Sequence, residues 1–424
     1  MRTRLFLVVM ALWRLTTLAP AQLIQEALED TEVGAAWIYH DYDKAVAQAK
    51  ETGKPLFVLF RCVPCEACKV FDGKVVGQDS ELAALYDAFV PVRIVRMNDV
   101  DLDLYQFDYD LSWAAFLQNA DGTVYGRYGT RAAAASETHI SIAGLKVALQ
   151  RALELHAGYP ANKALFDGKR GEPGEYRRPR DIPTLQQTVA EEDVRKGCVH
   201  CHMINDGFHR IAEEAGTWRN SDFFEHVYPL PESVGMAVDA DTGNVVQAVF
   251  PGSAAHRAGI HAGDEIVTIN GQAILSIADI QWVLFNAEAG STVEVSAVRH
   301  GDGRTALLDV SGDWTASDIS WRASMWPMRP SLGVWAPDLT DEERREMGLP
   351  TTTLARKVRW IPSEGLIEAG LRNGDIIVEM DGSTKRESHA EAETRVRMTY
   401  AEGDRVELVV WRDGERHTLD APLD

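Results

Sequence analysis

The sequence predicts a multidomain chain with one α/β domain, a short α-helical segment and two tandem β-rich modules of the α+β type. Three observations lead to this fold class. An amphipathic helix pattern at 41–52 precedes a continuous apolar run at 56–60, which is typical of a buried strand. A C-x-x-C-H pentapeptide stands at 198–202, and one set of glycine-rich motifs occurs twice in the C-terminal half. A chain of 424 residues has room for about three domains.

The N-terminal residues are typical of an export signal. Two arginines precede an apolar run at 5–13, and Ala19 and Ala21 provide the small residues of a signal-peptidase site. We therefore expect residues 1–21 to be a signal peptide that is cleaved after Ala21, and the mature protein to be periplasmic. The apolar run is shorter than the roughly 20 residues of a membrane-spanning helix, so no membrane insertion is expected beyond an uncleaved leader.

The overall charge restricts the partners of the chain. Acidic residues outnumber basic ones and give a formal net charge of -21. A surface of this sign repels the phosphate backbone of nucleic acids, so nucleic acid is not an expected partner.

The first predicted domain, residues 35–159, carries three cysteines in one turn. Cys62, Cys65 and Cys68 directly follow the predicted strand, and a helix pattern follows them. This order resembles the thioredoxin-like fold, particularly the exported thioredoxin-7 type, which opens with a G-K-P turn like the one at 53–55. The resemblance implies thiol chemistry, because a helix N-terminus stabilises the thiolate of a nearby cysteine.

Two cysteine pairs are compatible with an active site. The spacing from Pro55 favours Cys65 as the attacking thiolate and Cys68 as the resolving thiol. The competing pair, Cys62 and Cys65, has a proline before its second cysteine, as many thioredoxins do. Trp113 stands where thioredoxins carry a cis-proline, so substrate docking like theirs is not expected. The alternative is an ordinary structural disulfide in this turn.

The pentapeptide in the middle of the chain predicts a covalent cofactor. Residues 160–181 are rich in basic residues, glycine and proline and are predicted to form a linker, and residues 182–232 form the cofactor-binding segment. Cys198 and Cys201 are spaced to add to the two vinyl groups of one haem c, and His202 is placed to be the axial iron ligand.

The second axial position of such a haem is less defined by the sequence. His226 and Met236 are the weak distal candidates, because they lie far enough along the chain to reach the opposite face. A five-coordinate haem is also compatible with the sequence. The alternatives for the pentapeptide itself are a zinc half-site and a plain disulfide.

The repeated motifs predict two modules of one kind. The glycine-rich pattern at 252–271 returns at 363–382, and both copies resemble the PDZ domains of bacterial proteins. The resemblance implies modules at 233–311 and 331–424, separated by a tryptophan-rich connector at 312–330.

PDZ domains bind protein C-termini or extended peptides by strand addition at an open sheet edge. The resemblance implies peptide contacts at the glycine-containing turn of each copy: Val234, Gly235 and Met236 in the first and Leu332, Gly333 and Val334 in the second. Helix 276–286 is expected to form one wall of the first groove. The alternative is that the copies serve as packing modules.

The complete arrangement resembles the exported thioredoxin-7/PDZ multidomain proteins of planctomycete-like bacteria, some of which carry selenocysteine where this chain has Cys68. It predicts an exported redox protein in which a C-x-x-C site and a c-type haem transfer electrons to a redox partner protein, while PDZ domains bind the peptide tails of partners. The expected activity is thiol–disulfide exchange or electron transfer. No G-x-S-x-G motif is present, so a protease is not expected. The alternative is a non-enzymatic PDZ adaptor or sensor, in which haem and disulfide are structural or regulatory.

Overall fold

The computed structural model describes residues 20–424 except 78–79, 134 and 311–316. The predicted leader lies outside the described residues apart from its last two positions, which begin helix α1 (Pro20–Ala27), so the signal peptide stays a prediction. The first part of the tryptophan-rich connector, with Trp314, also lies outside them. Within the described part of the chain, no helix is both long enough and apolar enough to cross a membrane.

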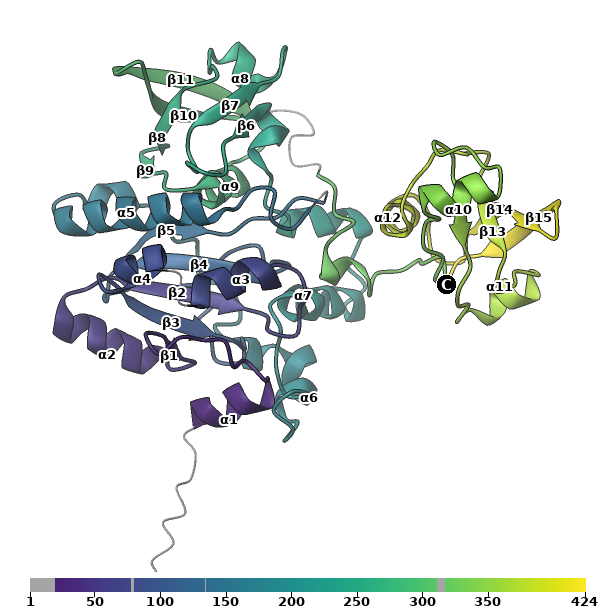
Figure 1. The fold of residues 1–424 in the computed structure, drawn as a ribbon, viewed down its shortest axis with the longest axis horizontal. Helices are drawn as coiled ribbons and strands as arrows, with labels where there is room; N and C mark the ends of the chain where they lie inside the picture. Colours follow the sequence, from purple (N-terminus) through teal and green to yellow (C-terminus); the bar gives the residue numbers. More distant parts are fainter. Residues whose placement is uncertain (1–19, 78–79, 134, 311–316) are drawn as a thin grey trace, which may run out of the picture.

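A five-stranded sheet with the order β1-β3-β2-β4-β5 forms the centre of the first domain (Figure 1). The strands are β1 (Ile38–Tyr39), β2 (Leu56–Arg61), β3 (Val90–Ile94), β4 (Trp113–Gln118) and β5 (Val124–Tyr128). The first three pair in parallel, and β4 and β5 run antiparallel to their neighbours. The helices around the sheet are α2 (Tyr42–Thr52), α3 (Lys69–Val76), α4 (Ser80–Tyr86) and α5 (Ile142–Gly158).

Strand β2 is buried on both faces, as its continuous apolar run predicts. Val58 and Phe60 face a core shared with α2, whereas Phe57 and Leu59 face a core shared with α3, α4 and α5. Side chains alternate along a strand, so this one strand anchors both layers of the domain. The cysteine-rich turn therefore begins at the end of a strand that is buried along its whole length.

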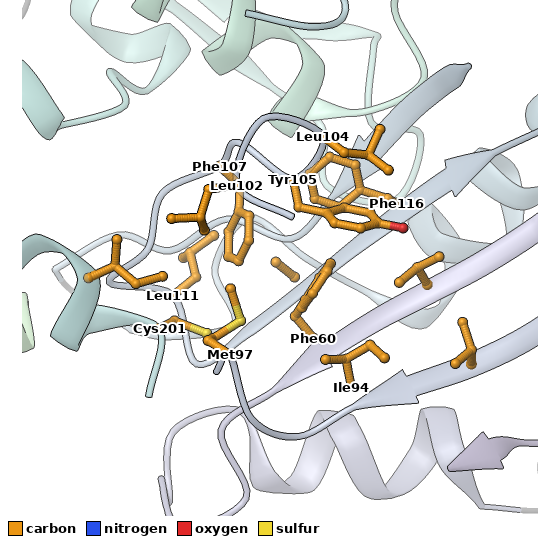
Figure 2. Packing of buried hydrophobic residues seen from close by; sticks show 14 of the residues in the cluster. Phe60, Ile94, Met97, Leu102, Leu104, Tyr105, Phe107, Leu111, Phe116 and Cys201 are labelled. Atoms are coloured by element: carbon orange, nitrogen blue, oxygen red, sulfur yellow. The ribbon is translucent and has the colours of Figure 1, made fainter. Parts of the chain in front are cut away.

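The segment that the sequence assigns to a separate cofactor-binding region belongs to the core of the first domain. Ile182, Val199 and Ile204 pack in the same cluster as Phe60, and Figure 2 shows Cys201 in that packed cluster. The segment consists of η3 (Pro183–Leu185), α6 (Gln186–Val189) and α7 (His202–Glu214), with η4 (Asn220–His226) after them. Its apolar residues cover the face of the sheet that α2 leaves open.

Both β-rich modules have the same order of elements, namely a short helix, a strand, a longer helix and a hairpin. In the first module these elements are β6 (Met236–Val238), β7 (Val246–Val249), α8 (Ala254–Arg257), β8 (Glu265–Ile269), β9 (Gln272–Ala273), α9 (Ile277–Phe285), β10 (Ser291–Arg299) and β11 (Asp302–Val310). In the second they are α10 (Asp341–Glu346), β12 (Arg356–Lys357), α11 (Glu364–Glu368), β13 (Ile376–Met380), α12 (His389–Thr399), β14 (Arg405–Arg412) and β15 (Glu415–Pro422).

The first module packs directly on the first domain, with α9 against β5 (Figure 1). Asp279 of α9 is fully buried, and its carboxylate accepts hydrogen bonds from Lys169 Nζ at 2.7 Å and from the backbone N–H of Arg127 at 3.1 Å. Trp282 Nε1 donates to the carbonyl of Gly168 at 2.7 Å. The residues predicted to be a linker are thus part of a buried interface, in which Lys169 forms an ion pair with Asp279.

Replacement of Asp279 by alanine is expected to destabilise the protein by about 3–5 kcal/mol, because the ammonium group of Lys169 remains buried without its partner. Urea denaturation followed by circular dichroism measures this loss. The matched control is Asp302→Ala, which removes a carboxylate that is largely exposed beside Arg304 and should change stability by less than about 0.5 kcal/mol. Equal effects of the two substitutions would contradict the role of the buried pair.

Candidate functional site

The three cysteines of the first domain lie in the turn that joins β2 to α3. The backbone N–H of Cys65 donates to the carbonyl of Cys62 at 3.1 Å, which tightens the turn. The sulfur atoms of Cys62 and Cys65 are 2.7 Å apart. All three cysteines are free thiols, and Cys65 is the most exposed of them. The turn therefore presents one accessible thiol in contact with one buried thiol.

The pair that the structure brings together differs from the pair that the spacing from Pro55 favours. Cys68 caps α3 with a left-handed backbone (φ 61°), and its Sγ lies 3.9 Å from the carbonyl oxygen of Ser136. This backbone directs the side chain away from Cys65 and toward the loop after β5. Cys62, which the sequence analysis treats as the competing choice, occupies the position of the second thiol.

The two adjacent sulfurs have opposite acidities. The hydrogen bond that Cys62 donates lowers the pKa of Cys65 to about 6. The same hydrogen bond and burial raise the pKa of Cys62 well above the usual value for a thiol. At neutral pH the pair therefore consists of a Cys65 thiolate and a Cys62 thiol, the combination that thiol–disulfide exchange requires.

Positive groups from three separate segments surround the Cys65 thiolate and lower its pKa further: Arg61, His202 and Arg131. Arg61 at the end of β2 donates from Nη2 to the carbonyl of Cys65 at 2.6 Å. The guanidinium of Arg131 lies 4.7 Å from the ring centre of Trp321, in the connector. His202 Nδ1 lies 3.1 Å from Asp206 Oδ2; burial opposes protonation of this ring, but the hydrogen bond to Asp206 outweighs it and raises the pKa of His202.

Alkylation of Cys65 is expected to depend on pH with a midpoint near 6. Below this pH the sulfur is protonated and loses its nucleophilicity, so the rate falls about tenfold for each pH unit; above it the rate is constant. Iodoacetamide labelling followed by peptide mass spectrometry measures the profile for Cys65 separately from the other thiols. A midpoint near 8.5, the value for an unperturbed cysteine, would contradict the assignment of Cys65 as the thiolate.

The middle residue of the pentapeptide contacts the turn of Cys62, Cys65 and Cys68, named the redox turn for its three thiols. His200 Nδ1 lies 3.1 Å from the sulfur of Cys62. Since the single proton of Cys62 is donated to Cys65, the ring nitrogen is assigned as the donor to Cys62. His200, Arg61 and Arg131 were not identified as site residues by the sequence analysis. Of these three residues, only Arg61 could have been predicted from the sequence, because it directly precedes the cysteine-rich turn.

The two cysteines predicted to hold haem are packed in the domain core. Cys198 and Cys201 are 3% and 6% exposed. The space beside Cys201, which Met97 and Val199 also line, has a volume of about 10 Å³, whereas small-molecule and cofactor sites occupy roughly 300–1,000 Å³. The side chains beside Cys201, as they are packed, leave no room for a porphyrin at that sulfur.

The two distal candidates lie in different parts of the structure. The ring of His226 packs over α7 at Phe208 and His209, with centroids 6.4 and 6.0 Å away. Met236 is fully buried in the core of the first β-rich module. Among the described residues, no group of three or more His, Cys, Asp or Glu side chains is placed to hold a metal ion. The haem therefore remains a prediction from the motif.

Trp113, at the position where thioredoxins carry a cis-proline, is buried in the same core cluster as Cys68. Its indole Nε1 donates to Asp72 at 3.1 Å. Asp72 also forms ion pairs with Arg61 at 3.2 Å and Arg93 at 2.8 Å. This buried network fixes Arg61, which in turn holds the backbone of Cys65.

The turn predicted to bind peptides in the first module has the expected backbone. Gly235 has the left-handed backbone (φ 87°) that such a turn needs, between the buried side chains of Val234 and Met236. The ring of Tyr228 packs in the module core and stacks on Phe285 of α9 at 4.0 Å. The apolar side chains of α9, Ile280, Val283 and Leu284, are buried in the same core.

The corresponding turn of the second module has an internal carboxylate in place. The backbone N–H of Leu332 points at Glu393 Oε2 at 3.4 Å, and Glu393 pairs with Arg397 on the same helix. Gly333 again has a left-handed backbone (φ 63°), and Val334 is buried. This turn therefore has the geometry to present backbone N–H groups to an acidic group.

Comparisons with known protein families identify two of the domains of this chain. A family described as thioredoxin-like matches residues 37–117, and a family described as PDZ domain matches residues 233–310. The chain contains a thioredoxin-like domain and a PDZ domain. The first β-rich module is thus the PDZ domain, and the redox turn belongs to the thioredoxin-like domain.

The curated relatives of the chain are serine endoproteases. A probable periplasmic serine endoprotease, DegP-like, from Pseudomonas fulva is 30% identical over 158 residues, which is 36% of this chain and 32% of that protein. A probable periplasmic serine protease do/HhoA-like protein from Haemophilus influenzae is 30% identical over 142 residues, 33% of this chain and 28% of that protein. The chain thus spans about a third of the length of these relatives.

Solved structures with local similarity carry related names. The HtrA-type protease AlgW with a tripeptide has 20% sequence identity and a TM-score of 0.21, covering 31% of this chain and 52% of that one. A serine endoprotease from Yersinia pestis has 18% identity and a TM-score of 0.20, covering 27% of this chain and 36% of that one.

These relatives contradict the expectation that the chain is not a protease. That expectation rested on the lack of a G-x-S-x-G motif, and curated proteins with which the chain shares sequence are named as serine proteases. The motif belongs to one class of hydrolase fold, while the same catalytic triad occurs on unrelated folds with other local sequences. Its absence therefore does not exclude protease chemistry.

Proposed function

We propose that this chain is an exported thiol–disulfide exchange protein in which Cys65 is the attacking thiolate and Cys62 the resolving thiol. The observation that carries the proposal is the 2.7 Å contact between the two sulfurs, in which the pKa of the more exposed one is lowered to about 6. Export is supported by the predicted leader and by relatives that are named as periplasmic.

The reaction follows from the positions of the two sulfurs. The Cys65 thiolate attacks one sulfur of a substrate disulfide, and the other substrate sulfur leaves as a thiolate. Cys62 then attacks Cys65 Sγ, which closes a Cys62–Cys65 disulfide and releases the second substrate thiol. Arg61 and Arg131 hold negative charge at Cys65 before the attack, and burial keeps Cys62 protonated until Cys65 is bonded to substrate.

The test is to identify which disulfide forms. The purified protein is equilibrated in glutathione buffers of graded potential, quenched with an alkylating agent and mapped by peptide mass spectrometry. We expect a Cys62–Cys65 disulfide, with Cys68 alkylated, in both the wild type and a Cys68→Ser variant. A Cys65–Cys68 disulfide, or no disulfide in the turn, would overturn the proposal.

We also propose an adaptor function for the second β-rich module, because exposed aromatic side chains gather near the start of α12. Trp326, Trp335 and Trp360 are 39%, 48% and 63% exposed, and the ring of His389 at the start of α12 lies 4.6 Å from that of Trp335. Exposed apolar groups gathered at one place indicate a binding surface.

Peptide binding at this module can be measured by tryptophan fluorescence. Apolar peptides are titrated with a free C-terminal carboxylate and, as the matched control, with an amidated C-terminus. We expect a saturable change with the free carboxylate and at least tenfold weaker binding of the amide, because only a free carboxylate can replace that of Glu393 at the backbone N–H of Leu332. Equal affinity for the two forms would rule out recognition of the carboxylate.

A further inference from the structure

A second pair of cysteines lies directly beneath the redox turn. Cys198 and Cys201 have the same C-x-x-C spacing as Cys62 and Cys65, and Cys201 caps the N-terminus of α7. The backbone between them is fixed to the thioredoxin-like domain: the N–H of Met97 donates to the carbonyl of Val199 at 2.9 Å. The pair is therefore held in place by the domain that carries the first pair.

The two pairs meet at one enclosed space. Cys62, His200 and Cys201 all line the space of about 10 Å³ behind the redox turn. A space of that size holds at most one water molecule, so the groups on its two sides are near neighbours. The contact of 3.1 Å between His200 Nδ1 and Cys62 Sγ fixes the second C-x-x-C segment against the first.

Burial limits what the second pair can react with. Cys198 and Cys201 are 3% and 6% exposed, so disulfides in solution do not reach them in the folded protein. The thiol on the opposite side of the enclosed space is Cys62, which itself bonds to the partly exposed Cys65 in the oxidised turn. A path from solvent to the second pair thus leads through the first.

We propose that Cys198 and Cys201 are a second dithiol that exchanges electrons with the Cys62–Cys65 pair. This inference rests on the proposed function, since it starts from the disulfide of the redox turn. It gives the C-x-x-C-H motif a role as an internal electron store, so that one molecule delivers four electrons to substrate disulfides instead of two.

The exchange takes two balanced steps. The Cys201 thiolate attacks Cys62 Sγ, the Cys62–Cys65 bond breaks, a Cys62–Cys201 bond forms, and the electron pair leaves on Cys65. The Cys198 thiolate then attacks Cys201 Sγ, forming the Cys198–Cys201 disulfide and releasing Cys62 as a thiolate. Two electrons pass from the second pair to the first. Cys198 and Cys201 lose two protons; Cys62 takes up one of them, and the other leaves to solvent because Cys65 stays ionised near neutral pH.

Cys65 is the favourable leaving group in the first step, because a sulfur of low pKa leaves a disulfide faster. The regenerated dithiol at the redox turn then reduces a further substrate disulfide. The disulfide of the substrate is the final oxidant, so no other co-reactant is needed.

The test compares the oxidation of the buried pair with and without the exposed thiol. The wild type and Cys65→Ser are incubated with oxidised glutathione, quenched with an alkylating agent, unfolded and mapped. We expect two disulfides in the wild type, Cys62–Cys65 and Cys198–Cys201, with Cys68 alkylated. In Cys65→Ser we expect Cys198 and Cys201 to stay reduced, although neither residue has been changed.

A second variant traps the intermediate. In Cys198→Ser the second step cannot occur, so a Cys62–Cys201 disulfide is expected to accumulate after oxidation. The matched control is Cys201→Ser, which cannot form this bond. The circular dichroism spectrum of each variant establishes that it is folded. If a variant does not fold, the disulfides mapped in the wild type still test the proposal.

The outcomes separate this inference from the proposed function. A wild type that forms Cys62–Cys65 while Cys198 and Cys201 stay reduced overturns the relay and leaves the proposed function intact. Equal oxidation of Cys198 and Cys201 in Cys65→Ser, or no Cys62–Cys201 bond in Cys198→Ser, also overturns it. Thioether-modified Cys198 and Cys201, with a protein mass increased by that of haem, overturns it in favour of the cofactor. Loss of the Cys62–Cys65 disulfide itself refutes the proposed function.

Discussion

Replacement of Cys65 by serine is expected to reduce the rate of disulfide exchange by at least about a thousandfold, as the loss of a catalytic nucleophile does in other enzymes. A serine hydroxyl does not ionise near neutral pH, so Arg61 and Arg131 have no anion to stabilise. The rate is measured as the reduction of insulin disulfides with dithiothreitol as the final reductant, compared at equal protein concentration with the wild type.

Two further variants define the role of each neighbouring thiol. Cys62→Ser keeps the attacking thiolate but lacks the resolving thiol, so it is expected to accumulate a mixed disulfide between Cys65 and the substrate. Cys68→Ser is expected to retain exchange within about twofold of the wild type, because the Cys68 sulfur faces the carbonyl of Ser136. A loss in Cys68→Ser as large as that in Cys65→Ser would show that the resolving thiol had been wrongly assigned.

Replacement of Asp72 by alanine is expected to destabilise the protein by about 3–5 kcal/mol, because the substitution leaves two buried guanidinium groups without their shared counter-ion. Arg61 and Arg93 both pair with this carboxylate, and Trp113 Nε1 donates to it. Arg93 retains its second partner, Asp30, at 2.8 Å, which keeps the loss within this range. Guanidinium denaturation monitored by tryptophan fluorescence measures the change.

The control for this substitution removes a carboxylate from the surface. Asp167→Ala changes an exposed residue of the segment after η1 (Lys163–Phe166) and is expected to alter stability by less than about 0.5 kcal/mol. If Asp72→Ala destabilised the protein by less than about 1 kcal/mol, the buried network beneath the redox turn would not be a main source of stability.

The strands and the duplicated modules could be predicted because their signals are local. The apolar run of β2 predicts a strand buried on both faces, and the structure places Phe57 and Phe60 in the two separate cores. The repeated glycine motifs mark turns that require a left-handed backbone, such as Gly235 and Gly333. Patterns of this kind depend only on residues that are neighbours in the sequence, so they can be recognised without knowledge of tertiary contacts.

The choice between cysteine pairs could not be made by counting. Spacing from Pro55 leads to Cys65, but it does not reveal that Cys68 has a left-handed backbone. The proline before Cys65 marks the pair whose sulfurs lie 2.7 Å apart in the structure. The cations around Cys65 include Arg131 and His202, which are distant from it in sequence. No local sequence pattern predicts that these side chains lie near Cys65.

The C-x-x-C-H pentapeptide shows a second limit of prediction from sequence. A five-residue pattern reports the spacing of thiols and an imidazole but not the burial of the segment that carries them. The apolar residues on either side, Ile182 and Ile204, indicate a segment that packs into a hydrophobic core. Which core it joins depends on packing against Phe60 and Met97, which are distant in sequence.

The packing of Val199 and Ile204 beneath β2 determines how the molecule can be divided. The region of family similarity ends at residue 117, yet the hydrophobic layer under its central strand is completed by residues more than sixty positions later. A recombinant fragment cut at that similarity boundary would expose this layer to water and lose the imidazole that touches Cys62. The smallest autonomous redox unit of the protein therefore extends at least through α7.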